Sequence, residues 1–184
     1  MNEDVKSDKE RLRKRYRLER HDGFIPVEFT NLPEITEMKA ARVIASYVSF
    51  GDEPVTDLLN QSLLNAGKTL LLPCISGSEM TLVQWNGEAS KLNTKTRIPE
   101  PIGEPFNNLA AVDVVIVPAL RMDSEGYRLG QGGGFYDRFL PKVSAWKIGL
   151  LHDGELSSQK LPREAHDIAL NAAATPDLVI RFKA

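Results

Sequence analysis

Cysteine is almost absent from the 184-residue sequence, because Cys74 is the only one. A single thiol excludes an internal disulfide framework and is too few for a cysteine-rich zinc site. Cys74 lies in the apolar string LLLPCI, which favours a small buried hydrophobic side chain over a nucleophile. No apolar run approaches the roughly 20 residues that span a bilayer, and residues 1–20 lack the apolar core of a signal peptide. We therefore expect a cytoplasmic protein.

An excess of either charge is also absent, since 23 Lys and Arg face 25 Asp and Glu for a net charge of −2. This balance gives no general reason to expect binding to nucleic acid or to a membrane. Residues 5–20 are nevertheless rich in Arg and Lys and lack Gly and Pro, which predicts a helix with a basic face. Taken alone, this is a solvated surface helix, and RNA binding is an alternative that the overall acidity disfavours.

Apolar segments that alternate with helical segments indicate an α/β protein. We expect helices near 5–20, 33–41 and 55–67 and strands near 42–49, 68–75, 79–85, 112–120, 146–151 and 177–182. The polar, proline-containing segment 86–109 predicts a long excursion over one edge of the sheet. Together these elements predict one domain over residues 1–184, a three-layer α/β/α sandwich with a mostly parallel sheet.

The loops that follow the strands are the candidate binding region, because ligands of such sheets bind at the carboxyl ends of the strands. This rule selects four loops, at 51–53, at 73–76, at 118–134 and from 152 onward. The last contains His166 and Asp167, a pair that is weak evidence for a site on its own. The third ends within the string GYRLGQGGGFYDRFL, residues 126–140, which is the most informative stretch of the chain.

The glycines of this string are expected to have a specific role, because glycine inside a packed element lowers stability by roughly 0.5–1 kcal/mol relative to alanine. Successive glycines let consecutive amides face one concavity, and Arg128 adds a guanidinium beside them, so both favour a phosphate. Asp137 follows at a position from which it could hold Mg²⁺ on that phosphate, or serve as an ordinary first-turn aspartate. No Walker string occurs, and Phe135 stands where a dinucleotide fingerprint needs its last glycine. A glycine-rich turn without a ligand stays the alternative.

Five strings, in order along the chain, resemble the 5-formyltetrahydrofolate cyclo-ligase family, also called 5,10-methenyltetrahydrofolate synthetases. The glycine string is similar to the family's Gly-x-Arg-Leu-Gly-x-Gly-x-Gly signature with its two aromatics and Asp. Lys9, Leu12 and Arg13 match a Lys-x-x-Leu-Arg motif near the start. YVSFGDEPVT resembles the Glu-containing loop after the first strand, RIPEP the Ile-x-Glu-Pro turn, and LPREAHD the closing Pro-x-Glu-x-His-Asp.

The resemblance implies a Rossmann-like, CoA-transferase-like fold and a reaction. ATP and 5-formyltetrahydrofolate would give 5,10-methenyltetrahydrofolate, ADP and phosphate, with Mg²⁺ required. The formyl oxygen is a poor leaving group, and the family is understood to phosphorylate it before N10 attacks the formyl carbon. The implied partners are a reduced folate and ATP, with no nucleic acid and no membrane, and the protein would be a monomer or a homodimer.

The resemblance also implies roles for individual residues, with Lys9 and Arg128 catalytic. The implied ATP-binding residues are Lys9, Arg13, Arg128, Leu129, Gly130, Gln131, Gly132, Gly133, Gly134, Phe135 and Tyr136. Val48, Phe50, Glu53 and Tyr136 would contact the folate, with Glu53 accepting hydrogen bonds from the pterin nitrogens. Asp137 and Asp167 would hold Mg²⁺. For Phe50, Phe135 and Tyr136, ordinary core packing is the alternative.

The sequence departs from this family pattern in the glycine string. Many relatives carry a basic residue at the position of Gln131 or a lysine at that of Gly133, whereas both are neutral here. The phosphate cradle would then depend more on Arg128 and on the amides, and Arg121 is a candidate to replace the missing charge. Many relatives have Asp where this chain has Asn171, so we assign that residue no role. The neutral positions keep open a relative that binds ATP or folate without turnover.

Overall fold

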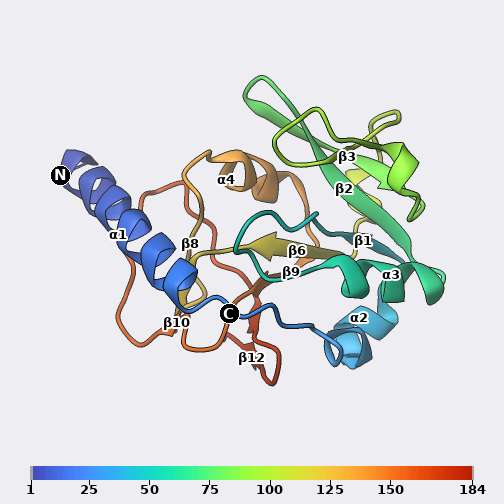
Figure 1. Ribbon diagram of the computed structural model, residues 1–184. Coiled ribbons are helices and arrows are strands. Elements are labelled where there is room, and N and C mark those ends of the chain that lie inside the picture. Colours follow the sequence, from blue (N-terminus) through green and yellow to red (C-terminus); the bar gives the residue numbers. More distant parts are fainter. Residues whose placement is uncertain (1, 184) are drawn as a thin grey trace.

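The computed structural model describes residues 2–183 and contains a seven-stranded sheet with the strand order β12-β11-β9-β6-β1-β2-β3 (Figure 1). Its strands are β1 (Val43–Ala45), β2 (Thr69–Ser76), β3 (Glu79–Trp85), β6 (Val114–Pro118), β9 (Trp146–Leu150), β11 (Ala172–Ala174) and β12 (Val179–Arg181). The five inner strands run parallel to their inner neighbours, and the edge strands β3 and β12 are antiparallel. The prediction of a mostly parallel sheet is confirmed.

The central strand β6 shows why these apolar runs form strands buried on both faces. Val115 and Val117 belong to one hydrophobic core, and Val114 and Ile116 belong to the other. Successive side chains of a strand point to opposite faces, so a continuous apolar run fills two cores at once. A run of this kind is stable only between two covering layers.

Helices on both faces of the sheet supply these layers. On one face, the 3₁₀ turn η1 (Leu32–Glu34), α2 (Thr36–Ala40) and α3 (Asp57–Asn65) contribute Leu32, Met38, Leu59 and Leu63 to the core. On the other face, the five-residue α4 (Phe135–Phe139) and η4 (Leu140–Lys142) contribute Phe139 and Leu140. The α/β/α prediction is thus confirmed, although the layer that contains α4 and η4 is thin.

Segment 86–109 crosses the β2–β3 edge of the sheet, as predicted, but it also forms short elements. These are η2 (Ala89–Lys91), β4 (Leu92–Asn93), β5 (Glu100–Pro101) and η3 (Leu109–Ala111). The segment is attached to β2 and β3: the amide of Ile75 donates to Glu100 Oε1 at 3.2 Å, and the amide of Phe106 donates to the Leu82 carbonyl at 2.7 Å. The attachment brings Ile98, Pro99 and Glu100 back over the end of β2.

A second small sheet, β10-β7-β8, carries the start of the glycine string. It consists of β7 (Arg121–Asp123), β8 (Arg128–Leu129) and β10 (Leu156–Ser157). The turn between β7 and β8 closes on the fully buried Asp123, whose Oδ1 accepts the amides of Glu125 and Tyr127 at 3.0 and 3.1 Å. This hairpin projects Arg128 from the end of the central strand β6.

Several boundaries differ from the sequence-based expectation. The strand predicted at 42–49 ends at Ala45, because the following residues join a buried polar network in which the Tyr47 carbonyl accepts bonds from Thr56 and Asn60. The helix predicted at 33–41 is divided into η1 and α2. Strand β11 was not predicted, and Cys74 is half-buried rather than buried.

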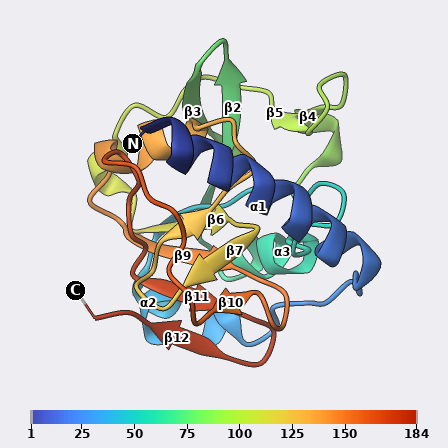
Figure 2. The same ribbon diagram turned by 90° about the vertical axis from the view of Figure 1, so that its left-hand side faces the viewer.

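Helix α1 (Asn2–Asp22) lies across the carboxyl ends of the parallel strands, toward which β6 points (Figures 1 and 2). Neither hydrophobic core contains a residue of this helix, so its attachment to the sheet is mainly polar. No helix within residues 2–183 combines the length and apolar character needed to cross a bilayer.

Candidate active site

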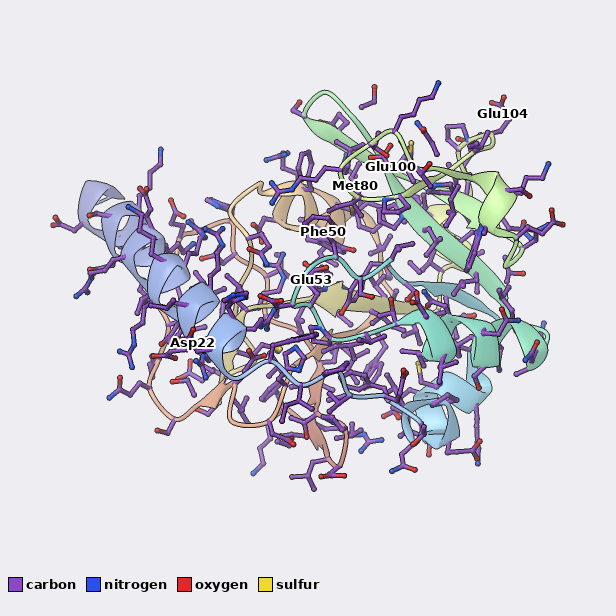
Figure 3. The ribbon with its side chains drawn as sticks, in the orientation of Figure 1. Asp22, Phe50, Glu53, Met80, Glu100 and Glu104 are labelled. Atoms are coloured by element: carbon purple, nitrogen blue, oxygen red, sulfur yellow. The ribbon has the colours of Figure 1, made fainter. Side chains whose placement is uncertain are left out.

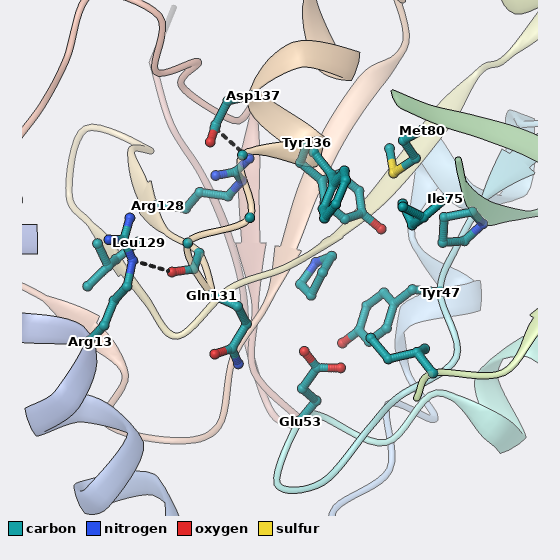
Figure 4. Close-up of a pocket in the computed structure, with 18 of the residues that line it drawn as sticks. Arg13, Tyr47, Glu53, Ile75, Met80, Arg128, Leu129, Gln131, Tyr136 and Asp137 are labelled. Atoms are coloured by element: carbon teal, nitrogen blue, oxygen red, sulfur yellow. Dashed lines mark hydrogen bonds and ion pairs between the residues drawn. The ribbon is translucent and has the colours of Figure 1, made fainter. Parts of the chain in front are cut away.

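A cavity of about 450 Å³ lies between α1 and the carboxyl ends of β1, β2 and β6. Its wall includes residues from all four loops that the strand-end rule selected, among them Glu53, Ile75, Arg128 and Asp167. The wall has two unlike halves: one side is basic and rich in glycine, and the other is apolar with single carboxylates (Figure 4).

Helix α1 supplies cations to the basic half, since Lys6, Lys9 and Arg13 all line the cavity. Lys9 is 4% exposed, and its Nζ donates to Glu164 Oε2 at 2.8 Å and to Asp167 Oδ2 at 2.6 Å. Four residues later, on the same face of the helix, Arg13 Nε donates to the Gly130 carbonyl at 3.0 Å. The bond from Lys9 lowers the pKa of Glu164, which is therefore held in its charged form.

The glycine loop presents a run of free amides. No backbone carbonyl within residues 2–183 accepts a hydrogen bond from the nitrogens of residues 130–134. Gly132 and Gly134 have φ values of +103° and +68°, which L side chains rarely adopt. A Cβ at Gly132 would also lie 3.4 Å from Arg13 Nε. The loop therefore requires glycine for its shape and leaves its donors for water or a ligand.

Arg128 stands beside these amides with unused donors of its own. Its side chain is 5% exposed, and Nη2 donates to Asp137 Oδ1 at 2.8 Å. Its Nε is buried and has no hydrogen-bond partner among the described residues. Arg128 lines the cavity beside the free amides, so its guanidinium is placed where it could meet an anionic group.

The apolar half is built by Tyr47, Ile75, Met80 and Tyr136 around the carboxylate of Glu53 (Figure 4). Burial raises the pKa of Glu53, and the Phe50 amide, which donates to its Oε2 at 3.1 Å, opposes the rise. Burial, followed by the charge of Glu53, also raises the pKa of Tyr136, so the phenol stays protonated. The half therefore combines a flat apolar surface with one polar anchor, which suits a heterocyclic ring with N–H donors.

Among residues 2–183, one group of three carboxylate and imidazole side chains could share a cation. Ligand atoms of Glu164, His166 and Asp167 lie within 4.8 Å of one another at the cavity wall. Asp137 is not part of this group and is paired with Arg128 instead.

The sequence model of the 5-formyltetrahydrofolate cyclo-ligase family matches residues 6–176. The chain belongs to the 5-formyltetrahydrofolate cyclo-ligase family. The 5-formyltetrahydrofolate cyclo-ligase of Mycolicibacterium smegmatis is 34% identical over 146 residues, 74% of this chain and 75% of the relative. That of Escherichia coli K12 is 35% identical over 147 residues, 76% of this chain and 80% of the relative.

A solved structure agrees with this membership. The NMR structure of 5,10-methenyltetrahydrofolate synthetase from Aquifex aeolicus has a TM-score of 0.80 and 30% identity, covering 96% of this chain and 93% of that one. A second synthetase structure, from Mycoplasma pneumoniae, has a TM-score of 0.66 at 18% identity and supports the fold.

Nearly all residues that the cyclo-ligase motifs indicate lie on the wall of this same cavity. The set consists of Lys9, Arg13, Val48, Glu53, Arg128, Leu129, Gly130, Gln131, Gly132, Gly133, Gly134, Phe135, Tyr136, Asp137 and Asp167. Phe50 does not line it. This residue lies on the same loop as Glu53 (Figure 3), but its side chain is 38% exposed and Arg97 stacks over its ring at 5.1 Å. The expectation that Phe50 contacts the folate is therefore not supported by its position.

Arg121 does not replace the missing positive charge of the glycine loop. Its guanidinium donates to the Gly154 carbonyl at 2.6 Å and to Glu19 at 2.7 Å, and it stacks on Tyr16 at 4.1 Å, so it anchors α1. Asn171 likewise acts in the fold, since its Oδ1 accepts the amide of Lys147 at 2.8 Å.

Other wall residues were missed by sequence reasoning, among them Tyr47, Ile75, Met80 and Glu100. The apolar members of this set carry no signal, because an apolar residue at a strand end looks the same whether it faces a core or a cavity. Glu164 could have been selected from the sequence, since it lies in the same LPREAHD string as Asp167.

Proposed function

We propose that this protein, as a single cyclo-ligase domain, converts 5-formyltetrahydrofolate and ATP into 5,10-methenyltetrahydrofolate, ADP and phosphate with Mg²⁺. The observation that carries the proposal is the two-sided cavity. One half offers cations and unpaired amides for a polyphosphate, and the other offers an apolar wall with Glu53 for a folate ring. Membership in the cyclo-ligase family supports the same reaction.

The basic half fits a nucleoside triphosphate. The unpartnered Nε of Arg128 and the free amides of residues 130–134 are donors without acceptors. Lys9 and Arg13 reach the same wall from α1. ATP, when bound there, supplies the phosphoryl group that makes the formyl oxygen a good leaving group. The chain then needs to orient the reactants and stabilise charge, for which it has cations and amides rather than a covalent nucleophile.

The acidic residues of the wall fit a magnesium ion. Carboxylate oxygens are the ligands that Mg²⁺ prefers, and it usually takes one or two of them together with substrate phosphates. Asp167 and Asp137 are each paired with a cation, Lys9 and Arg128 respectively. We propose that Mg²⁺ with its nucleotide takes over both carboxylates while the phosphates take over both cations. The exchange keeps every charge at the site compensated.

The apolar half fits the folate. Tyr47 and Tyr136 provide aromatic surface, and Glu53 provides an acceptor whose raised pKa reflects its removal from water. An N–H donor of the pterin would satisfy this carboxylate and recover the cost of burying it. In this arrangement the formyl group lies between the two halves, next to Arg128 and the amides.

The test follows the absorbance of the methenyl product from 5-formyltetrahydrofolate, with and without MgATP. Product that depends on both ATP and Mg²⁺ supports the proposal. Binding of both ligands without product would assign the chain to a non-catalytic relative instead. Asp137→Asn should shift the Mg²⁺ titration of the rate to higher concentration, and an unchanged titration would remove Asp137 from the metal site.

A further inference from the structure

We propose that Arg17 is a positioning residue for the nucleotide: it fixes the peptide between Gln131 and Gly132 so that the loop amides are turned away from α1 before a ligand arrives. The inference rests on the proposed function and adds a residue that none of the cyclo-ligase motifs contains. Arg17 does not line the cavity, so its effect would be exerted through the glycine loop.

The contacts of Arg17 are all with one residue of that loop. Its Nε donates to Gln131 Oε1 at 2.9 Å, and its Nη2 donates to the Gln131 carbonyl at 2.6 Å. One planar guanidinium thus holds both the side chain and the main chain of Gln131, a geometry that a lysine ammonium cannot reproduce. Arg13, one helical turn earlier, holds the preceding carbonyl, that of Gly130.

These two bonds determine where the loop amides point. In a trans peptide the carbonyl and the N–H of the same unit point in opposite directions, and the structure contains no cis peptide within residues 2–183. The carbonyls of Gly130 and Gln131 point to α1, so the N–H groups of Gln131 and Gly132 point away from it. These N–H groups are among those left without a backbone acceptor.

The residues of the loop itself do little to fix this orientation. Gly132 and Gly133 have no side chains, and residues 131–133 are exposed, so the chain can rotate its peptides at little steric cost. Ordering such a loop during binding would cost backbone entropy. A residue that orders the loop in advance saves that cost.

The experiment measures binding of the non-hydrolysable analogue adenylyl imidodiphosphate with Mg²⁺ by calorimetry, and separately the binding of 5-formyltetrahydrofolate. We expect Arg17→Ala to raise the nucleotide Kd about tenfold and to leave the folate Kd unchanged. Arg11→Ala is the matched control, because Arg11 is exposed on the same helix and bonds only to Asp8. It should leave both constants unchanged.

Two further variants separate positioning from a direct charge effect. Gln131→Ala keeps the main-chain carbonyl, so it should weaken nucleotide binding less than Arg17→Ala does. Arg17→Lys keeps the charge but loses the fork, so it should restore only part of the affinity. Full recovery with lysine would show that a point charge suffices and would overturn the inference.

The remaining outcomes are also decisive. A nucleotide Kd for Arg17→Ala equal to that of Arg11→Ala would overturn the inference, as would an equal loss of nucleotide and folate binding, which would indicate a general disturbance of α1. If the wild type forms methenyl product while Arg17→Ala binds normally, only this inference fails. A wild type that binds no nucleotide would refute the proposed function and the inference together.

Discussion

Replacing Arg20 by methionine should weaken the attachment of α1 to the sheet and lower the free energy of unfolding. Arg20 is a buried basic residue of the last turns of the helix, and its side chain is 4% exposed beside Glu155 at 7%. Its Nε and Nη2 donate to the two oxygens of Glu155 at 2.7 and 2.6 Å, and Nη2 also donates to the Ala119 carbonyl at 2.6 Å. Methionine keeps an unbranched apolar stem and has no donor, so the change removes the pair while the packing of the stem is retained.

The expected loss follows from what remains after the substitution. Glu155 would be a buried carboxylate whose other bond is the amide of His152 at 2.8 Å. Breaking a buried ion pair by removing one partner costs about 3–5 kcal/mol. The whole free energy of unfolding of a domain is about 5–15 kcal/mol, so roughly a fifth or more of it is at stake. The double variant Arg20→Met/Glu155→Gln should recover part of the loss because no unpaired charge is left.

Urea denaturation followed by circular dichroism measures this prediction, with Arg11→Ala as an exposed control on the same helix. We expect a large fall in the urea midpoint for Arg20→Met, a smaller one for the double variant and none for the control. A single variant that loses less than about 1 kcal/mol would refute the reasoning, because the pair would then contribute no more than a surface pair. A double variant less stable than the single one would refute the role assigned to the unpaired carboxylate.

Three other substitutions test separate parts of the structure. Arg128→Ala should lower kcat by about 10²–10³ while the protein still unfolds cooperatively, and near-normal turnover would contradict its role beside the glycine amides. Gly126→Ala should lower the urea midpoint, because Gly126 has φ +84° and a Cβ there would lie 2.6 Å from the Leu170 carbonyl; an unchanged midpoint would show that this turn relaxes freely. Glu53→Gln should change the pH dependence of stability, because burial raises the pKa of Glu53 from its ordinary value of 4.5. The folded state then holds the proton more tightly than the unfolded state, so the wild type loses stability as the pH rises from about 4.5 through the raised pKa. The stability of the variant relative to the wild type should therefore increase between pH 4 and pH 7 in urea titrations, and a constant difference would contradict the assignment.

The sheet could be predicted largely because its strands are encoded by local patterns. The run VVIVP of β6 is apolar at every position, which is typical of a strand that is buried on both faces. This strand could therefore be predicted from the sequence. Ala172–Ala174 of β11 forms a strand just as buried, but three alanines have no strand preference. Its position between β9 and β12 is imposed by tertiary pairing, which no local pattern contains.

The candidate site divides in the same way. Gly132, Gly134 and Arg128 could be selected because glycine and arginine are unusual next to a buried strand. Tyr47 and Met80 could not be selected, because facing a cavity leaves no mark on an apolar residue. The ion pairs of Lys9 with Glu164 and Asp167 join residues 155 and 158 positions apart, so only the fold brings these charges together.

The polar attachment of α1 has a consequence for how the protein is made. The helix is synthesised first, yet its partners at Ala119, Gly130, Gln131, Glu155, Glu164 and Asp167 all leave the ribosome much later. Because α1 has no share in either hydrophobic core, the sheet can assemble while the helix waits unattached. Docking of α1 then becomes a late step of maturation, and a nascent chain completes the wall of its cavity only after Asp167 has emerged.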